Sequence, residues 1–277
     1  MRVIVTGADG QLGHDLRRTL GQYDLISYSI EDLDIVDLSA VVNRIEEIGP
    51  DVVVNCAAYT DVDGCENNQT QAYKVNAGGP QNLAIACERS GAAILQVSTD
   101  FIFDGTKGSP YLEFDNPNPL NVYGRSKLAG EIYVSSLTNR YYIVRTAWLY
   151  GHNGNNFVKS ILRIAQEKEK LRIVNDQIGS PTFTYDLAER IADIILSESY
   201  GIYHVVNGGQ CSWYDFGKKI LELAGVKRTV DPISSGDLDQ PAKRPKYSVL
   251  DDLSLRTRGF SPLRTWEEGL VAYFEES

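Results

Sequence analysis

The segment Val3–Gly13 constrains the fold of this chain more than any other, because an apolar run leads into a glycine-rich turn and then a helical pattern. Gly7, Gly10 and Gly13 are spaced three residues apart, and leucines then recur at helical intervals. Glycines let the backbone approach a phosphate, and a helix N-terminus offers unpaired N–H groups and a positive dipole end. We therefore expect a strand–turn–helix unit that holds a dinucleotide. Because the spacing departs from the usual G-x-G-x-x-G, an ordinary glycine-rich turn is the alternative.

The first half of the chain alternates between apolar runs and helical patterns. The run 51–55 has the composition of a strand buried on both faces of a parallel sheet. Further strands are expected at 25–28, 92–98 and 141–145, and helices at 41–48, before Gly49-Pro50, and at 71–90. This alternation predicts an α/β fold with a doubly wound, Rossmann-type parallel sheet.

The second half has a less regular pattern. Helices are expected near 156–167, 183–197 and 213–224, strands near 171–174 and 202–206, and a surface loop over 231–247. We predict that residues 1–150, joined by a returning segment at about 183–206, form an NAD(P)-binding domain. Residues 151–277 would form mainly a smaller, interleaved substrate-binding lobe.

Charge and cysteine content limit the possible partners. The formal net charge of −10 disfavours binding to nucleic acid or to anionic membranes. The four cysteines form no C-x-x-C pair and have no histidine cluster beside them, so we expect free buried thiols in a reducing compartment rather than zinc or disulfides. The expected strand at residue 2 leaves no room for a signal peptide, and no apolar run approaches the ~20 residues of a membrane span. We expect a cytoplasmic protein.

Two groups of polar residues carry the candidate chemistry. Thr99 ends an expected strand, where ligands of open α/β sheets bind. Further on, Tyr123 and Lys127 stand four residues apart in a helix expected to begin at Pro119, so they share one helix face. An ammonium near a phenol lowers the pKa of the phenol, which would allow proton exchange near neutral pH.

A second Tyr-x-x-x-Lys pair exists at Tyr214 and Lys218, so the spacing alone does not decide. The position does, because Tyr123 follows both the glycine turn and the strand that ends in Ser98-Thr99.

These motifs together resemble the extended short-chain dehydrogenase/reductase family, and within it the dTDP-4-dehydrorhamnose reductases. The resemblance runs from residue 1 to about 260. It rests on the glycine turn and on N-C-A-A-Y-T-D-V-D (55–63), S-T-D-F-I-F-D-G (98–105), P-L-N-V-Y-G-R-S-K-L-A-G-E (119–131), R-T-A-W-L-Y-G (145–151), N-N-F (155–157) and N-D-Q-I-G-S-P-T (175–182).

The resemblance implies that NADPH or NADH reduces the 4-keto group of dTDP-4-dehydro-L-rhamnose to give dTDP-L-rhamnose. Tyr123 would give the proton to the developing alkoxide, Lys127 would lower the tyrosine pKa and bind the nicotinamide ribose, and Thr99 would orient the carbonyl. Related dehydratases carry an Asp-Glu pair after the threonine, whereas this chain has Asp100-Phe101, which favours simple reduction. Family members commonly have tyrosine at the Phe101 position.

The resemblance also implies the binding residues. Cofactor contacts are expected at Gly7, Gly10, Gln11, Leu12, Gly13, Asp34, Ile35, Ala57, Ala58, Tyr59, Asn76, Tyr123 and Lys127. Substrate contacts are expected at Thr60, Val62, Asp100, Phe101, Trp148, Asn156 and Arg244, with Gln177, Gly179 and Thr182 in neighbouring motifs. A surface acid at Asp34, a core Trp148 and a solvated Arg244 are the alternatives. The strand end Ser27-Tyr28-Ser29 carries neither an acid nor an arginine, so the choice between NAD and NADP stays open.

Some of these reductases dimerise through Mg²⁺ held by glutamates, but the matching position here is Asp15, so we predict no metal site. A homodimer stays open. Two alternatives to the reductase are considered: a non-catalytic NADP-binding regulatory subunit similar to the β subunit of methionine adenosyltransferase, and a ketoreductase or epimerase acting on another nucleotide sugar.

Overall fold

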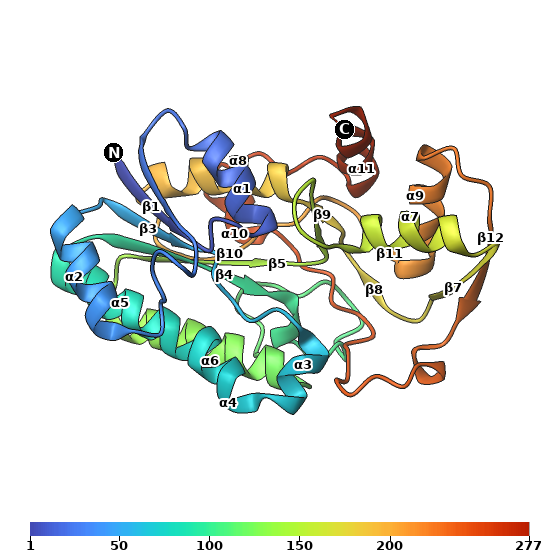
Figure 1. Ribbon diagram of the computed structural model, residues 1–277, viewed down its shortest axis with the longest axis horizontal. Coiled ribbons are helices and arrows are strands. Elements are labelled where there is room, and N and C mark those ends of the chain that lie inside the picture. Colours follow the sequence, from blue (N-terminus) through green and yellow to red (C-terminus); the bar gives the residue numbers. More distant parts are fainter. Residues whose placement is uncertain (277) are drawn as a thin grey trace.

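A six-stranded parallel sheet forms the centre of the computed structural model, which describes residues 1–276 (Figure 1). Its strands run in the order β10-β5-β4-β3-β1-β2, and every pairing is parallel. The chain therefore reverses direction across the sheet at β1, the switch point where such folds bind ligands. The strands are β1 (Arg2–Thr6), β2 (Asp24–Tyr28), β3 (Val52–Asn55), β4 (Ala93–Thr99), β5 (Tyr141–Thr146) and β10 (Gly201–His204).

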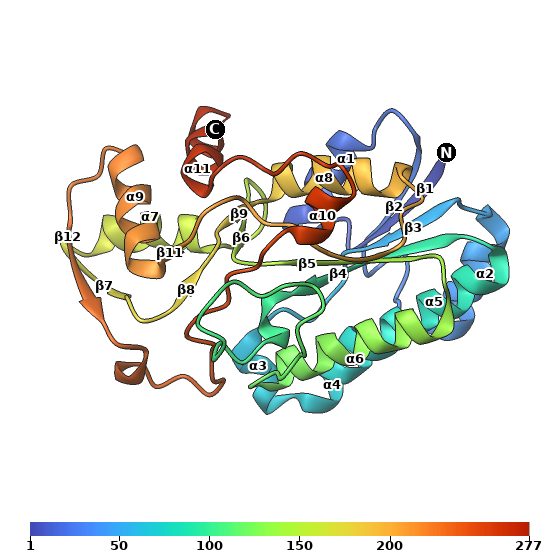
Figure 2. The ribbon, with the colours of Figure 1, turned by 180° about the vertical axis from the view of Figure 1, so that it is seen from behind.

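Helices cover both faces of this sheet, which confirms the predicted doubly wound fold. On one face lie α1 (Gln11–Thr19), α8 (Thr184–Leu196) and α10 (Leu253–Thr257), and on the other lie α2 (Leu38–Ile48), α5 (Gly79–Ser90) and α6 (Val122–Leu137) (Figures 1 and 2). Strand β3 shows why its sequence is apolar throughout. Val52 and Val54 join the core under one helical layer, whereas Val53 joins the core under the other.

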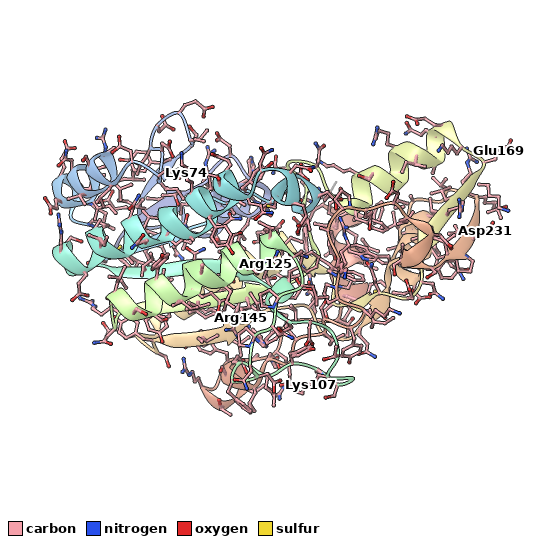
Figure 3. The ribbon with its side chains drawn as sticks, turned by 90° about the horizontal axis from the view of Figure 1, so that it is seen from below. Lys74, Lys107, Arg125, Arg145, Glu169 and Asp231 are labelled. Carbon is pink, nitrogen blue, oxygen red and sulfur yellow. The ribbon has the colours of Figure 1, made fainter. Side chains whose placement is uncertain are left out.

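The helix expected over 71–90 is interrupted. It consists of α4 (Gln69–Tyr73), a π-helical turn (Lys74–Gly78) and α5, and a short α3 (Val62–Asn67) precedes it. The π-helical turn carries Asn76, whose amide bonds both backbone groups of Tyr59 at 2.8 and 3.0 Å. Pro80, which lacks an N–H group, stands in the first turn of α5. Seen from below, α5 and α6 lie side by side, with Lys74 and Arg125 labelled on this outer face (Figure 3).

Two other expectations need correction. The predicted loop 231–247 begins inside a strand, β12 (Thr229–Ile233), which pairs with β7 (Lys170–Val174) and is followed by a 3-10 turn (Ser235–Asp237). Pro232 is tolerated there because β12 is an edge strand of a two-stranded sheet. Helix α6 begins at Val122 rather than near Pro119, because the Asn121 side chain accepts from the Gly124 N–H at 2.8 Å and so caps it.

The second half of the chain builds a core of its own beside the large sheet (Figure 2). Helices α7 (Phe157–Glu167), α9 (Trp213–Leu223) and α11 (Trp266–Glu275) enclose it together with three small sheets, β11-β8, β12-β7 and β6-β9. The remaining short strands are β6 (Leu149–Tyr150), β8 (Ile178–Gly179), β9 (Thr182–Phe183) and β11 (Cys211–Ser212). Within residues 1–276, the structure contains no helix with the length and apolar character of a membrane span.

A buried ion pair joins α6 to the sheet. Arg145 of β5 donates to Glu131 of α6 at 2.7 Å, and both side chains are almost completely buried. The same guanidinium donates to the Glu113 carbonyl at 3.0 Å. Burial and the neighbouring Arg145 lower the pKa of His204 to about 3, so this imidazole is neutral.

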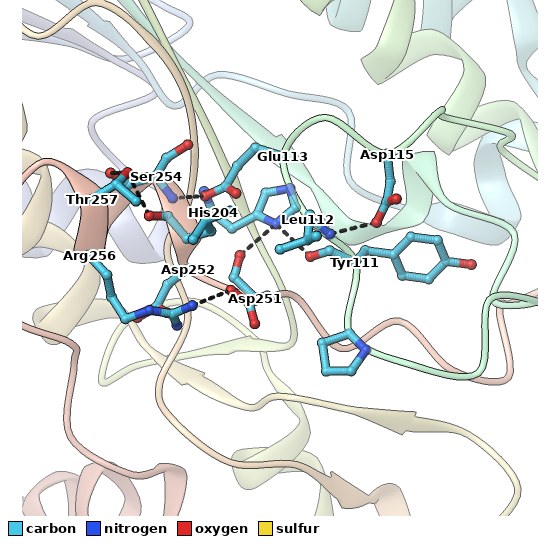
Figure 4. A network of polar contacts seen from close by, with 12 residues as sticks. Tyr111, Leu112, Glu113, Asp115, His204, Asp251, Asp252, Ser254, Arg256 and Thr257 are labelled. Atoms are coloured by element: carbon cyan, nitrogen blue, oxygen red, sulfur yellow. Dashed lines mark hydrogen bonds and ion pairs between the residues drawn. The ribbon is translucent and has the colours of Figure 1, made fainter.

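The neutral His204 connects the long loop between β4 and α6 to the C-terminal region. Its Nδ1 atom lies 3.1 Å from the Tyr111 carbonyl and 3.0 Å from the Asp251 carbonyl (Figure 4). Glu113 accepts from the backbone N–H groups of His204 and Ser254 (Figure 4). The network therefore fixes three segments that are far apart in the sequence.

Removing one partner of the buried ion pair should destabilise the fold strongly. Arg145→Met leaves the Glu131 carboxylate buried and uncompensated, so we expect the free energy of unfolding to fall by about 3–5 kcal/mol. Urea denaturation followed by circular dichroism measures this. The double variant Glu131→Leu/Arg145→Met is the control, and it should be more stable than Arg145→Met alone. Equal stability of the two variants would contradict the argument.

Candidate active site

The turn between β1 and α1 is as tight as the glycine pattern predicts. Gly7 has a φ of +67°, and a Cβ atom there would lie 2.6 Å from the Ala57 nitrogen. A Cβ atom on Gly13 would lie 2.4 Å from the Gly7 carbonyl oxygen. Helix α1 starts after Gly10, whose lack of a side chain leaves the helix N-terminus without a side-chain cap. Its first N–H groups are therefore available to an anion such as a pyrophosphate.

The other predicted cofactor residues lie along the same edge of the sheet or just beneath it. Ala57, Ala58 and Tyr59 follow β3 and are partly exposed, whereas Leu12 and Ile35 are buried in the cores. Asp34 is exposed and accepts from the Val36 N–H at 3.0 Å.

Asn76 is buried beneath this edge. Besides its bonds to Tyr59, its amide donates to the Ser126 hydroxyl at 3.0 Å. It thereby joins the segment after β3 to helix α6.

Thr99, the last residue of β4, stands opposite the first turn of α6. The Thr99 hydroxyl accepts from the Phe101 N–H at 3.2 Å and lies 3.1 Å from an Asp100 carboxylate oxygen. The Phe101 ring meets the Tyr123 ring edge-on, with centroids 5.8 Å apart. Helix α6 comes this close because residue 124 is glycine: a Cβ there would lie 2.1 Å from the Phe101 carbonyl oxygen.

The Tyr123 phenol is held in its protonated form. Burial raises its pKa well above the ordinary value, and a hydrogen bond with Thr99 opposes this only in part. The net shift of the Tyr123 pKa in this structure is therefore upward, opposite to the lowered pKa that the sequence analysis expects. The physical reason is that the Lys127 ammonium donates to the Val97 carbonyl at 2.7 Å, while desolvation dominates at the phenol.

Lys127 is itself perturbed. Burial lowers its pKa to about 8, and the negative charge of Glu131, one turn further along α6, opposes this shift. A phenol that keeps its proton and an amine that titrates near neutral pH thus occupy the same helix face. This pair can donate a proton to a carbonyl oxygen.

Asp100 is buried directly beside this pair. Burial raises the pKa of its carboxyl to about 6, against the lowering effect of hydrogen bonds from Ser248 and Thr99. The Ser248 hydroxyl donates to it at 2.5 Å. The sequence analysis did not identify Ser248, because a single serine near the C-terminus belongs to no recognisable motif.

Ser248 belongs to the segment 242–250, which lies across the two halves of the molecule. The Ile178 N–H donates to the Lys246 carbonyl and the Ser248 N–H to the Ile178 carbonyl, at 2.8 and 2.9 Å. In the first half, the Asn121 amide donates to the Lys243 carbonyl at 2.8 Å. Arg244, a predicted substrate contact, makes a two-pronged ion pair with Asp63, at 3.2 and 2.8 Å.

The remaining predicted substrate residues line both halves. Thr60 is exposed after β3, Val62 begins α3, and Asn156 caps α7 while donating to Gln11 of α1 at 2.9 Å. Trp148 is half-buried after β5, and its ring stacks on Trp213. In the neighbouring motifs, Gln177, Gly179 and Thr182 are all buried.

Two other positions from the sequence analysis lie outside this group. Asp15 is buried and accepts from the Thr184 hydroxyl. The second Tyr-Lys pair forms a cation–π contact on α9, with the Lys218 ammonium 5.2 Å from the Tyr214 ring centre.

Comparison with known proteins identifies a family and relatives that this chain resembles. The whole chain, residues 1–277, matches the family described as RmlD substrate binding domain. The spore coat polysaccharide biosynthesis protein SpsK of Bacillus subtilis (strain 168) is 41% identical over 277 residues, 99% of this chain and 97% of SpsK. The dTDP-4-dehydrorhamnose reductase of Streptomyces griseus is 42% identical over 282 residues, 99% of this chain and 93% of that protein.

A solved structure is also similar to this chain, in both sequence and fold. The crystal structure of dTDP-4-dehydrorhamnose reductase from Bacillus anthracis str. Ames in complex with NADP superposes with a TM-score of 0.98 at 46% identity. The superposition covers 100% of this chain and 99% of that one.

The buried Asp100 carboxyl should make stability depend on pH. Its folded pKa of about 6 lies above the ordinary 3.8, so its contribution is present below pH 3.8 and lost as the pH rises through 6. Relative to Asp100→Asn, the unmodified protein should lose about 1 kcal/mol of unfolding free energy between pH 5 and pH 7. Urea denaturation of both proteins at the two pH values measures the difference.

Asp104→Asn is the control for this measurement. Hydrogen bonds, first from the Thr106 N–H, hold the pKa of Asp104 at about 2, so its contribution is lost only as the pH falls below 3.8. Its difference from the unmodified protein should stay constant between pH 5 and pH 7. A constant difference for Asp100→Asn as well would contradict the assignment.

Proposed function

The chain belongs to the family of the RmlD substrate binding domain, and on this premise we propose that it reduces dTDP-4-dehydro-L-rhamnose to dTDP-L-rhamnose with NADPH. The relatives match it over nearly their full length and include a named reductase. One structural observation carries the proposal. Thr99, Tyr123 and Lys127 meet at the end of β4, on the sheet edge that also carries the glycine turn of β1.

The residues present fit a dinucleotide. Gly7 and Gly13 let the turn fold tightly, because a Cβ atom at either position would clash with neighbouring backbone, and the uncapped start of α1 supplies N–H donors for the pyrophosphate. Bound NADPH would supply the hydride that adds to C4 of the sugar. At the end of β2, Arg44 of α2 lies 5.8 Å from the Tyr28 ring centre and offers a positive charge for a ribose 2′-phosphate.

The other half of the reaction is a proton transfer by this chain. When C4 gains the hydride, its oxygen becomes an alkoxide and takes the proton from the Tyr123 hydroxyl, while the dinucleotide leaves oxidised. Burial raises the phenol pKa and so keeps the donor protonated before the reaction, and the proton passes to the alkoxide because the alkoxide is the stronger base. Thr99, which bonds the phenol, would orient the carbonyl oxygen, and the Lys127 ammonium would bind the nicotinamide ribose.

The acid–base arrangement supports reduction rather than dehydration. Elimination of water needs a second carboxylate beside Asp100, and position 101 instead carries a phenylalanine whose ring packs on Tyr123. Asp100 is occupied by the hydroxyl groups of Ser248 and Thr99. We assign it to substrate binding together with Phe101 and Trp148.

The remaining substrate contacts are assigned to Thr60, Val62, Asn156 and Arg244. Arg244 would bind the diphosphate by exchanging its Asp63 partner for a phosphate oxygen. The two halves would bind different ligands. Residues 1–150, with the returning segment 183–206, would hold the cofactor, and residues 151–277 would mainly hold the sugar nucleotide. The packing of α8 on α1 and the place of β10 in the large sheet support this division.

Location and partners complete the proposal. The four cysteines are free thiols, which supports a reducing, cytoplasmic location. The net charge of −10 supports a small-molecule substrate and no nucleic acid. The homodimer stays a prediction that sedimentation velocity would test. A purely regulatory role is less well supported, because Thr99, Tyr123 and Lys127 are all in place.

Tyr123→Phe tests the proton donor. Removing the hydroxyl should lower kcat by roughly 10²–10⁴-fold while NADPH binding is kept, because proton donation contributes about that much. The assay follows NADPH absorbance with dTDP-4-keto-6-deoxy sugar and the preceding epimerase, and NADPH fluorescence measures binding.

Tyr214→Phe is the matched control and should keep full activity. Unchanged turnover in Tyr123→Phe would exclude the assigned donor. NADPH binding by the unmodified protein without turnover would favour the regulatory alternative, and turnover only with other nucleotide sugars would favour a different ketoreductase or epimerase.

A further inference from the structure

Trp148 has a backbone conformation that bulky residues rarely adopt. Its φ is +48°, in the left-handed region that normally favours glycine. Its neighbours hold it there, because the Trp148 carbonyl accepts from the Thr182 N–H at 3.3 Å and Leu149 pairs with Thr182 in the small sheet β6-β9. Such strain persists only where the surrounding structure imposes it, and it gathers at functional sites.

The strained residue lies next to the candidate catalytic group. In the large sheet Thr99 pairs with Thr146. Trp148 comes two residues after Thr146 in the chain. The Trp148 side chain packs against two cores. One core contains Ile102 and Phe103, which follow Thr99 closely in the chain. The other is the core of the second half.

The Trp148 ring is held by two contacts from the second half, one at strand β8 and one at the start of helix α9. The Trp213 ring stacks on it with centroids 3.5 Å apart and planes at 7°. Gly179 approaches it so closely that a Cβ atom there would lie 2.5 Å from Cε2 of Trp148. Gly179 belongs to β8, and Trp213 directly follows β11, the strand whose Cys211 pairs with Gly179.

Trp213 is firmly placed. It is the first residue of α9, whose start is fixed by a capping box between Ser212 and Asp215. Its ring also contacts Phe157 of α7, with centroids 4.5 Å apart. The stack therefore covers one face of the Trp148 ring and connects it to the core of the second half.

We propose that Trp213 is a positioning residue: it holds the Trp148 ring in the orientation in which that ring packs against the sugar of the nucleotide substrate. The proposal rests on the proposed function only in that the ligand is a nucleotide sugar. Sugar rings present C–H faces that pack on aromatic rings, so the orientation of the indole would set how well the sugar fits. Fit to the sugar would thus depend on strand β8 and the start of helix α9, neither of which contains Trp148.

Trp213→Leu should separate binding from chemistry. Removing the stacked ring should raise KM for the sugar nucleotide by roughly three- to tenfold, the size of one aromatic contact, with kcat and KM for NADPH within about twofold. Trp213→Phe should restore most of the loss. Two stacked indoles also couple their ultraviolet transitions, so the far-ultraviolet circular dichroism should contain a Trp–Trp couplet that Trp213→Leu abolishes without any substrate present.

Trp266→Phe is the matched control. Trp266 is likewise the first residue of a helix fixed by a capping box and lies in the same core, but its ring meets Phe216, with centroids 5.9 Å apart. This variant should keep both the couplet and KM. An unchanged KM in Trp213→Leu after loss of the couplet, or an equal rise in KM in Trp266→Phe, would overturn the proposal.

Failure of the proposed function would look different. If the unmodified protein shows the couplet but no turnover, the reductase assignment fails and the substrate role of Trp213 fails with it. If the unmodified protein turns over the sugar but shows no couplet, the stack is wrong and the reductase assignment stands.

Discussion

The attachment of one face of helix α6 to the central sheet is the constraint on which the rest of the site depends. Gly124, Lys127 and Glu131 stand on this face at helical intervals, and each contributes a contact to this attachment. Gly124 lets the Phe101 carbonyl approach, Lys127 bonds the Val97 carbonyl, and Glu131 pairs with Arg145 inside the protein. Tyr123 is carried to the end of β4 by these three contacts.

The same contacts couple stability to chemistry. The Glu131 carboxylate neutralises Arg145 and also favours the charged form of Lys127, so one buried charge serves both the fold and the candidate site. The network around His204 and Glu113 extends this attachment to the C-terminal region. Burial lowers the pKa values of Lys127 and His204, because their charged forms lose hydration where they pack between helix and sheet.

Segment 242–250 joins the two halves of the molecule at the site itself. Its backbone pairs with Ile178 of the second half, and its side chains reach Asp63 and Asp100 of the first. A substrate between the halves would meet residues from both, and the Trp148–Trp213 stack is the corresponding contact on the side of β5. The relative position of the halves therefore decides which polar groups face the substrate.

Local sequence pattern was a reliable guide to the helices and strands of the large sheet, and it placed the catalytic candidates on them. The buried strand Val52–Asn55, the glycine turn and the helix that carries Tyr123 and Lys127 were all foreseen, because each depends on neighbouring residues. The misses have a common cause. The π-helical turn at Asn76, the strand β12 and the pairing of Arg244 with Asp63 each depend on a partner remote in sequence.

The sequence by itself determined the doubly wound fold and the tight glycine turn, because periodicity and spacing encode them within a few turns of chain, and it supplied Tyr123 and Lys127 as candidates for proton transfer. Only the tertiary structure decided the electrostatics. Tyr123 keeps its proton because desolvation raises the pKa of this half-buried phenol beside Phe101, and the Lys127 ammonium is bound to a backbone carbonyl of β4. The degree of burial and the choice of partner follow from how helix, sheet and the C-terminal segment pack together, and no stretch of the chain records that on its own.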